Sequence, residues 1–221
     1  MRATKRKTAS TTFHSLDNAL NIYSPLSNLE LRRLVMDKKE FEAIFKEGTV
    51  IVPDPEDANP LLQGGYGVSR EDEESSTLSP CEALYLLSED RIKILDGETE
   101  EEIDFQSLLI KFRLIDDEVW NKYLIYRDLR SRGYVVRDGI GLGVDFRLYA
   151  RGTYGEKAAK FIVYAICEGT PTPIQKLQEI LFIAQNMKKQ IIIAVMDTRG
   201  EIVYYSLQSL NFLDAFIEEK D

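Results

Sequence analysis

The residue types that most often carry out chemistry are sparse in this chain of 221 residues. It has one histidine, His14, and two cysteines, Cys81 and Cys167, which lie far apart in sequence without a neighbouring His or Cys. This spacing fits neither a zinc site nor a disulfide framework. Glycine-rich strings occur at residues 64–67 and 139–143, but no Lys-Ser or Lys-Thr follows the first, and the second precedes a predicted strand instead of a helix. We therefore expect neither a nucleotide phosphate loop nor a dinucleotide site.

The charge balance limits how the chain could bind nucleic acid. It has 28 lysines and arginines against 37 aspartates and glutamates, a formal net charge of −9. Phosphate backbones require local positive charge, so an RNA contact must come from a basic patch or from a partner. Basic residues are concentrated in the second half of the chain, although many could equally be charges on helix surfaces. They are Arg127, Arg130, Arg132, Arg137, Arg151, Lys157, Lys160, Lys188 and Lys189.

No part of the sequence has the length and apolarity of a membrane segment. No uninterrupted apolar run approaches the ~20 residues of a membrane span, and residues 1–13 lack the apolar core of a signal peptide. The hydrophobic content of 44% is that of an ordinary soluble protein. We expect no membrane association and a cytoplasmic location.

The first half of the chain predicts a small mixed α/β domain over residues 26–116, preceded by a disordered basic tail over residues 1–25. Its clearest local signal is a helix start, with Ser79 as the cap and Pro80 at the first helical position. The other expected elements are a partly helical segment over residues 26–45, a strand over 49–52, a turn over 54–59, a strand over 91–95 and a helix over 105–112.

The second half is organised around residues 123–149. Tyr123, Tyr126 and Leu129 share one face of a helix, which Gly133 ends. Further strands are expected over residues 134–136, 145–149, 161–167, 191–196 and 202–207, with a helix over 174–188 and a last short helix or dimer contact over 212–217. The whole chain is thus expected to be α/β (α+β), with a second domain over residues 117–221 in which two helices cover a mixed sheet of four or five strands.

Three strings of residues carry a family resemblance. They are Y-R-D-L-R-x-R-G-Y-V-V-x-x-G followed by G-x-D-F-x-x-Y within residues 126–149, LSPCEALYLLSEDRIKI at 78–94, and IIIAVMDTRGEIVYY at 191–205. In this order and at these intervals they resemble the archaeal tRNA-splicing endonucleases, the tRNA-intron endonucleases, over about two thirds of the chain. The resemblance implies a restriction-endonuclease-like second domain and precursor tRNA as the substrate.

The resemblance also implies a reaction that needs no metal or cofactor. A ribose 2′-hydroxyl attacks its own phosphate and leaves a 2′,3′-cyclic phosphate and a 5′-hydroxyl, with tyrosine, histidine and lysine as the family's catalytic side chains. Tyr149 matches the tyrosine and Lys188 the lysine, but Lys157 occupies the histidine position, and His14 lies outside the matching region. A lysine ammonium, with an unperturbed pKa near ~10.4, donates a proton less readily than imidazolium near ~6.5 unless burial lowers its pKa.

A second departure concerns substrate binding. The family has an arginine about two turns before the active lysine, which grips a flipped base, and this chain has Leu181 there. The remaining positions imply RNA contacts from Arg151, Lys160 and Lys189, and a docking turn with Asp197 and Glu201 that would fit a basic cleft on a neighbouring dimer.

These departures lead us to expect a structural subunit in an α₂β₂ assembly, which associates with itself through its C-terminal strand and with a catalytic endonuclease subunit. Two alternatives stay open. One is an active endonuclease that uses Tyr149, Lys157 and Lys188, and the other is a non-enzymatic RNA- or protein-binding module on the same fold. Tyr149 and Lys188 also have ordinary structural explanations, as a residue at a strand end and as a charge that answers a helix dipole.

Overall fold

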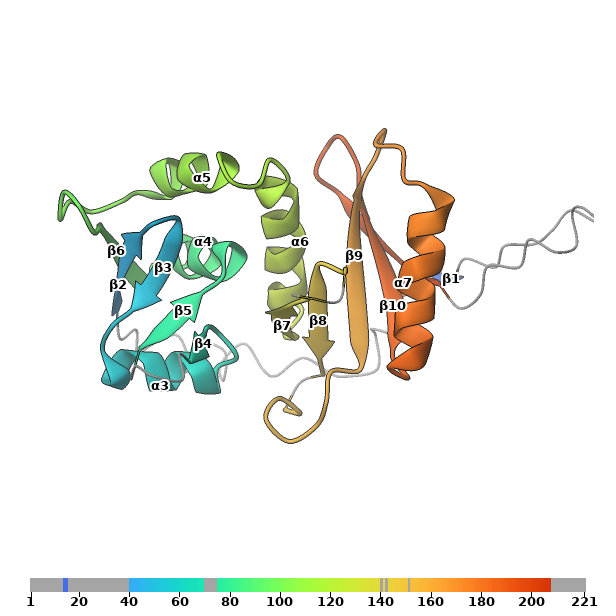
Figure 1. The fold of residues 1–221 in the computed structure, drawn as a ribbon, viewed down its shortest axis with the longest axis horizontal. Helices are drawn as coiled ribbons and strands as arrows, with labels where there is room; N and C mark the ends of the chain where they lie inside the picture. The colour runs from blue at the N-terminus through green and yellow to red at the C-terminus, as the bar shows by residue number, and fades with distance from the viewer. Residues whose placement is uncertain are drawn as a thin grey trace, which may run out of the picture.

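The computed structural model describes residues 40–69, 75–139, 141, 143–150 and 152–207, together with the backbone of residues 14–15. The short helix or dimer contact expected over residues 212–217 lies outside this part of the chain, and so does the basic tail expected over residues 1–25 except for residues 14–15, which form a short strand. Within it, the fold consists of two sheets, one in each half of the sequence, with helix α6 (Val119–Ser131) standing between them (Figure 1).

The first sheet has five strands in the order β4-β5-β3-β2-β6. Strand β2 runs antiparallel to β3 and parallel to β6, so the sheet is mixed. Its buried residues alternate along β2, where Phe41 and Ala43 face the core while Glu42 and Ile44 are exposed. The strands are β2 (Phe41–Lys46), β3 (Thr49–Val52), β4 (Val68–Ser69), β5 (Ser76–Leu78) and β6 (Ile92–Asp96).

Three helices accompany this sheet: α3 (Pro55–Gln63), α4 (Pro80–Ser88) and α5 (Phe105–Arg113). Each begins at a side-chain cap. Asp54 caps α3, Ser79 and Glu82 form a reciprocal capping box on α4, and Asp104 caps α5. Such caps satisfy backbone N–H groups that have no partner inside the helix, and so they fix where each helix starts.

The second sheet has six strands in the order β1-β11-β10-β9-β8-β7. Strands β9 and β10 are parallel and the other pairs are antiparallel. Helix α7 (Ile174–Asn186) connects β9 to β10 and lies on the face away from the first sheet (Figure 1). The strands are β1 (His14–Ser15), β7 (Val135–Asp138), β8 (Phe146–Tyr149), β9 (Phe161–Cys167), β10 (Gln190–Met196) and β11 (Ile202–Leu207).

One hydrophobic core joins the two halves. Tyr123, Tyr126 and Leu129 of α6 are buried together with Leu84 of α4 and Phe146 of β8. A second, smaller core lies under α7 and includes Ile162, Ile180 and Ile191. The helix face predicted from the spacing of the two tyrosines is therefore the face that holds the two sheets together.

The mixed α/β architecture with two sheets is confirmed, and three local expectations are wrong. Residues 41–45 belong to strand β2 instead of a helix, because they pair with strands on both sides. The expected turn over residues 54–59 is largely helix α3, which begins at Pro55 and tolerates Pro60 within it. The second sheet has six strands instead of four or five, because β1 pairs with β11.

Candidate functional site

Strand pairing brings Tyr149 and Lys188 to the same end of the second sheet. Leu148 of β8 lies opposite Phe161 of β9, and Phe161 lies opposite Gln190 of β10. Tyr149 follows the first of these residues and Lys188 precedes the last by two positions. Since neighbouring strands lie about 4.8 Å apart, roughly 10 Å of sheet separates β8 from β10 at this end. Lys157 lies in the loop that joins β8 to β9 at this end, so all three family positions are at one edge of the domain.

The ring of Tyr149 is held by one aromatic neighbour. It ends β8, opposite Val135 of β7, and is partly buried. Tyr154 packs edge-on against it, with the ring centroids 5.0 Å apart and an angle of 87° between the planes. Sequence reasoning missed Tyr154, because the loop after β8 has no periodic pattern that would give its side chain a direction.

Lys188 lies just beyond the end of α7 in a left-handed conformation, with φ 53°. Its N–H donates to the Gln185 carbonyl at 3.0 Å, and the N–H of Lys189 donates to Ala184 at 2.9 Å. Such bonds close a helix C-terminus around one left-handed residue, a position that usually favours glycine. The turn leaves the Lys188 side chain exposed.

The remaining predicted lysines differ in their exposure and in the contacts of their side chains. Lys157 is exposed, and its backbone N–H donates to Thr153 at 2.9 Å. Lys160 is exposed, with its ammonium 5.1 Å from the centroid of the Phe161 ring. Lys189 instead donates its ammonium hydrogen to the Ala159 carbonyl, which ties down the loop between β8 and β9. Arg151 lies outside the described residues.

The only imidazole of the chain lies far from this end of β8. His14 is on β1 opposite Ser206, and the register continues through Ile192 and Val163 to Phe146. Four strand spacings of about 4.8 Å place the two edges of this row roughly 19 Å apart. His14 is therefore not a neighbour of Tyr149 within the chain.

Leu181 is part of the core. It is 9% exposed and lies in the cluster under α7 with Ile180, Ala184 and Ile191. A side chain at this position faces the sheet, so it cannot stack on a nucleobase. An arginine there would bring a charge into an apolar cluster.

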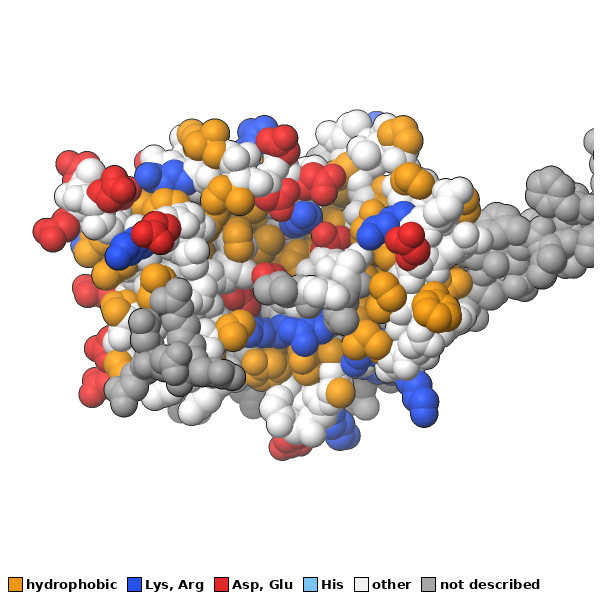
Figure 2. Space-filling model, viewed as in Figure 1, with side chains coloured by type: hydrophobic (Ala, Val, Ile, Leu, Met, Phe, Trp, Pro, Cys, Tyr) orange, Lys and Arg blue, Asp and Glu red, His pale blue; other side chains and the backbone are white. Residues whose placement is uncertain are grey.

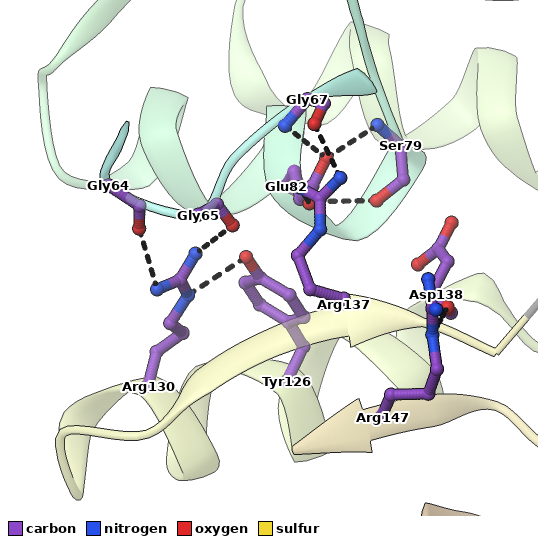
Figure 3. A network of polar contacts seen from close by, with 10 residues as sticks. All are labelled: Gly64, Gly65, Gly67, Ser79, Glu82, Tyr126, Arg130, Arg137, Asp138 and Arg147. Atoms are coloured by element: carbon purple, nitrogen blue, oxygen red, sulfur yellow. Dashed lines mark hydrogen bonds and ion pairs between the residues drawn. The ribbon is translucent and has the colours of Figure 1, made fainter. Parts of the chain in front are cut away.

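Two of the basic residues singled out in the sequence form polar contacts across the boundary between the two halves (Figure 3). Arg130 donates to the carbonyls of Gly64 and Gly65 at 3.3 and 2.8 Å and to the Tyr126 hydroxyl at 3.0 Å, and it lies over the Tyr66 ring at 3.8 Å. These contacts fill the planar fork of the guanidinium. Arg130 is therefore an internal clamp and does not belong to a surface patch.

Arg137 makes a buried ion pair with Glu82, with 2.8 Å between Nη1 and Oε1 (Figure 3). The second oxygen of Glu82 accepts from the N–H groups of Gly67 and Ser79, both at 3.0 Å, and Arg137 also donates to the Gly67 carbonyl. The two partners are 55 residues apart in sequence, so no local sequence pattern could predict the pair. It fixes the glycine turn of the first half onto strand β7.

Asp138 lies beside this ion pair. Burial, and secondarily the charge of Glu82, raise its pKa to about 6, against the opposing effects of the Ser79 side chain, Arg137 and Arg147. Arg147 donates its Nε hydrogen to the Asp138 carbonyl at 2.9 Å. A carboxyl group held between two halves of the molecule thus titrates close to neutral pH.

The predicted docking turn connects β10 to β11. Oδ1 of Asp197 accepts from the N–H groups of Arg199 and Glu201, both at 2.8 Å, so this carboxylate stabilises its own turn. Glu201 is exposed, and the backbone N–H of Thr198 donates to a carboxylate oxygen of Glu168 at 3.3 Å. The turn is therefore pre-shaped, and Glu201 is the carboxylate of the two that is freer to meet a partner.

The described part of the chain offers neither a metal site nor a membrane-spanning helix. No group of three or more His, Cys, Asp or Glu residues is placed to hold a metal ion there. None of the described helices has both the length and the apolarity needed to cross a membrane.

Both halves of the chain match models of one protein family. Residues 41–109 match the family model of the tRNA intron endonuclease N-terminal domain, and residues 119–204 match that of the tRNA intron endonuclease catalytic C-terminal domain. The chain belongs to the tRNA intron endonuclease family.

Individual relatives carry a more specific name. The tRNA-splicing endonuclease of Methanococcus vannielii is 34% identical over 170 residues, which is 77% of this chain and 94% of the relative. That of Methanococcus maripaludis is 33% identical over the same shares of both chains. The tRNA-splicing endonuclease of Thermococcus onnurineus is 33% identical over 135 residues, 61% of this chain and 77% of the relative.

Proposed function

We propose that this chain is the structural subunit of an α₂β₂ tRNA-splicing endonuclease that excises introns from precursor tRNA at bulge-helix-bulge sites. Cleavage would be carried out by a partner chain with a complete tyrosine, histidine and lysine, leaving 2′,3′-cyclic phosphate and 5′-hydroxyl ends. The observation that carries the proposal is the position of the sole histidine, His14, roughly 19 Å across the sheet from β8. Departure of the 5′ oxygen needs a proton donor beside the phosphate.

Two other observations support a structural role. Leu181 is buried where the family resemblance places a base-gripping arginine. Lys157 is exposed, so it lacks the buried surroundings on which a lysine acid would depend. The active alternative is supported by the match to the catalytic C-terminal domain and by the location of Tyr149, Lys157 and Lys188 at one end of the second sheet, but it has no imidazole beside them.

In this assembly the Asp197–Glu201 turn would dock on the catalytic subunit, and the C-terminal strand would carry self-association. The exposed Glu201 supports the docking role. Among the predicted RNA contacts, Lys160 is exposed at the site end of the sheet, whereas Lys189 would have to leave the Ala159 carbonyl to reach a phosphate.

The test compares three samples on a bulge-helix-bulge precursor tRNA: this chain, a catalytic chain from the same genome, and their mixture. We expect cleavage in the mixture and none by this chain alone. Tyr149→Phe in this chain should leave the rate of the mixture within about twofold, since no chemistry is assigned to that hydroxyl. The proposal is wrong if this chain alone releases the intron with a cyclic phosphate end and Tyr149→Phe abolishes that activity.

A further inference from the structure

A groove of about 540 Å³ lies at the opposite end of the second sheet from Tyr149 and Lys188. One wall is formed by α6, with Trp120, Leu124 and Arg127, and the other is the turn between β10 and β11, with Thr198 and Arg199. Strand β10 has seven residues. At about 3.3 Å per residue, it separates this groove from the Lys188 end by roughly 20 Å.

The α6 wall carries an exposed aromatic group. Trp120 is 38% exposed and lies against Tyr123, with 5.6 Å between ring centroids and 33° between planes. The Arg127 guanidinium lies over the same Tyr123 ring at 5.7 Å. Tyr123 is buried, so it supports the two exposed neighbours from below. Tryptophan and arginine held rigidly at a surface are the residue types that dominate binding energies at protein interfaces.

Large aliphatic side chains are also exposed at the end of α5 and in the corner before α6. Ile110 is 61% exposed, Leu114 85% and Ile115 68%. With Trp120, four large apolar side chains are exposed within eleven residues of sequence, and hydrophobic side chains gather over this end of α5 in the space-filling view (Figure 2). Clustered exposed apolar groups of this kind mark interaction surfaces, whereas single ones do not.

The charges around the groove decide which class of partner fits. Glu168 and Asp197 line the groove together with Arg127 and Arg199, so the charges of the lining itself balance. Three further exposed carboxylates, those of Asp117, Glu118 and Glu201, lie within three residues of lining residues in sequence and add negative charge beside it. A rim with this excess of negative charge repels a phosphate backbone and attracts basic side chains. Exposed aliphatic groups likewise match a polypeptide and offer little to RNA.

We infer that the Trp120 groove and the Ile110–Ile115 corner form one docking surface for a polypeptide segment of the catalytic subunit that carries basic and apolar side chains. The inference rests on the proposed function and extends the docking surface beyond Asp197 and Glu201. The β10–β11 turn is itself a wall of the groove, so a partner that engages the turn meets Trp120 in the same contact. Trp120 is the anchor, with the carboxylate rim meeting basic groups around it.

Trp120 is the chain's only tryptophan, which gives a direct test. The chain labelled with 5-fluorotryptophan should show one ¹⁹F resonance, and titration with the catalytic chain should shift or broaden it. Trp120→Ala should weaken binding of the catalytic chain at least tenfold, and Leu114→Ser, a change at a side chain outside the core, should weaken it about threefold or more. Phe182→Ala is the matched control, because Phe182 is 64% exposed on α7, away from the groove, and its loss should leave affinity unchanged.

Each other outcome overturns the inference in a recognisable way. If the catalytic chain binds with the resonance unmoved and with wild-type affinity for Trp120→Ala and Leu114→Ser, the docking surface is elsewhere and the proposed subunit role stands. An equal loss for Phe182→Ala would show that the effect is not specific to the groove. A resonance that responds to precursor tRNA alone would make the surface an RNA site. Failure to bind the catalytic chain at all would remove both the inference and the proposed function.

Discussion

Neutralising Asp138 should stabilise the protein at neutral and alkaline pH. Its carboxyl is partly buried between the two halves, and burial together with Glu82 raises its pKa to about 6. The folded protein therefore binds this proton more tightly than the unfolded chain, where the pKa is ~3.9. For an acid with a raised pKa, stability is highest at low pH and falls as the pH rises from about 4 to above 6.

The pKa difference sets the size of the effect. About two pKa units at 1.36 kcal/mol each give a penalty of about 3 kcal/mol above pH 7 as an upper value, and the remaining solvent access of the carboxyl reduces it to about 1–2 kcal/mol. Asp138→Asn removes the charge and keeps the shape. We expect the variant to unfold at a temperature about 2–8 °C above wild type at pH 8. At pH 5 about half of the penalty should remain, and at pH 4 little of it.

Thermal and urea unfolding followed by circular dichroism at pH 8, 6.5, 5 and 4 would measure this difference in unfolding temperature and free energy. Asp117→Asn is the control, because Asp117 is exposed and the charge change is identical. A stability advantage of Asp138→Asn that is missing at pH 8, or that grows on acidification, would refute the reasoning. Such a result would mean that the Ser79 side chain and the two arginines outweigh burial.

Three further predictions concern stability and are read from urea unfolding at pH 7.5. Glu82→Ala should cost about 3–5 kcal/mol, because it leaves Arg137 buried without its partner; a cost below about 1 kcal/mol would show that the pair is not sequestered. Gly65→Ala should cost about 2–4 kcal/mol, since φ is +75° and a Cβ would come within 2.3 Å of Val135 Cγ1. Gly152→Ala is the control and should cost about 1 kcal/mol, because φ is +68° but the space around it is open. Equal costs would contradict the predicted clash. Lys188→Gly should stabilise the chain by about 0.5–1 kcal/mol by relieving its left-handed backbone, and destabilisation would show that its side chain has contacts that hold the turn.

Local signals in the sequence predicted many of the elements well. The cap at Ser79, the helix through Tyr123 and Tyr126 and the strands on either side of α7 all form as expected. These signals lie within a few residues of the element they specify, so a single sequence contains them. The helix prediction for residues 41–45 was wrong because their apolar spacing suited a helix about as well as a strand. Pairing with β3 and β6 makes this segment a strand.

At the candidate site, too, some features follow from the sequence and others from the tertiary structure. The sequence alone determined that the chain has a single histidine and that leucine stands at position 181, and these identities carry the proposal of a structural subunit. Only the tertiary structure decided that Arg130 and Arg137 serve inside the molecule and that Trp120 faces a groove. Their partners lie on elements far away in sequence, some more than 50 residues off, and which distant groups meet is set by packing of the whole chain.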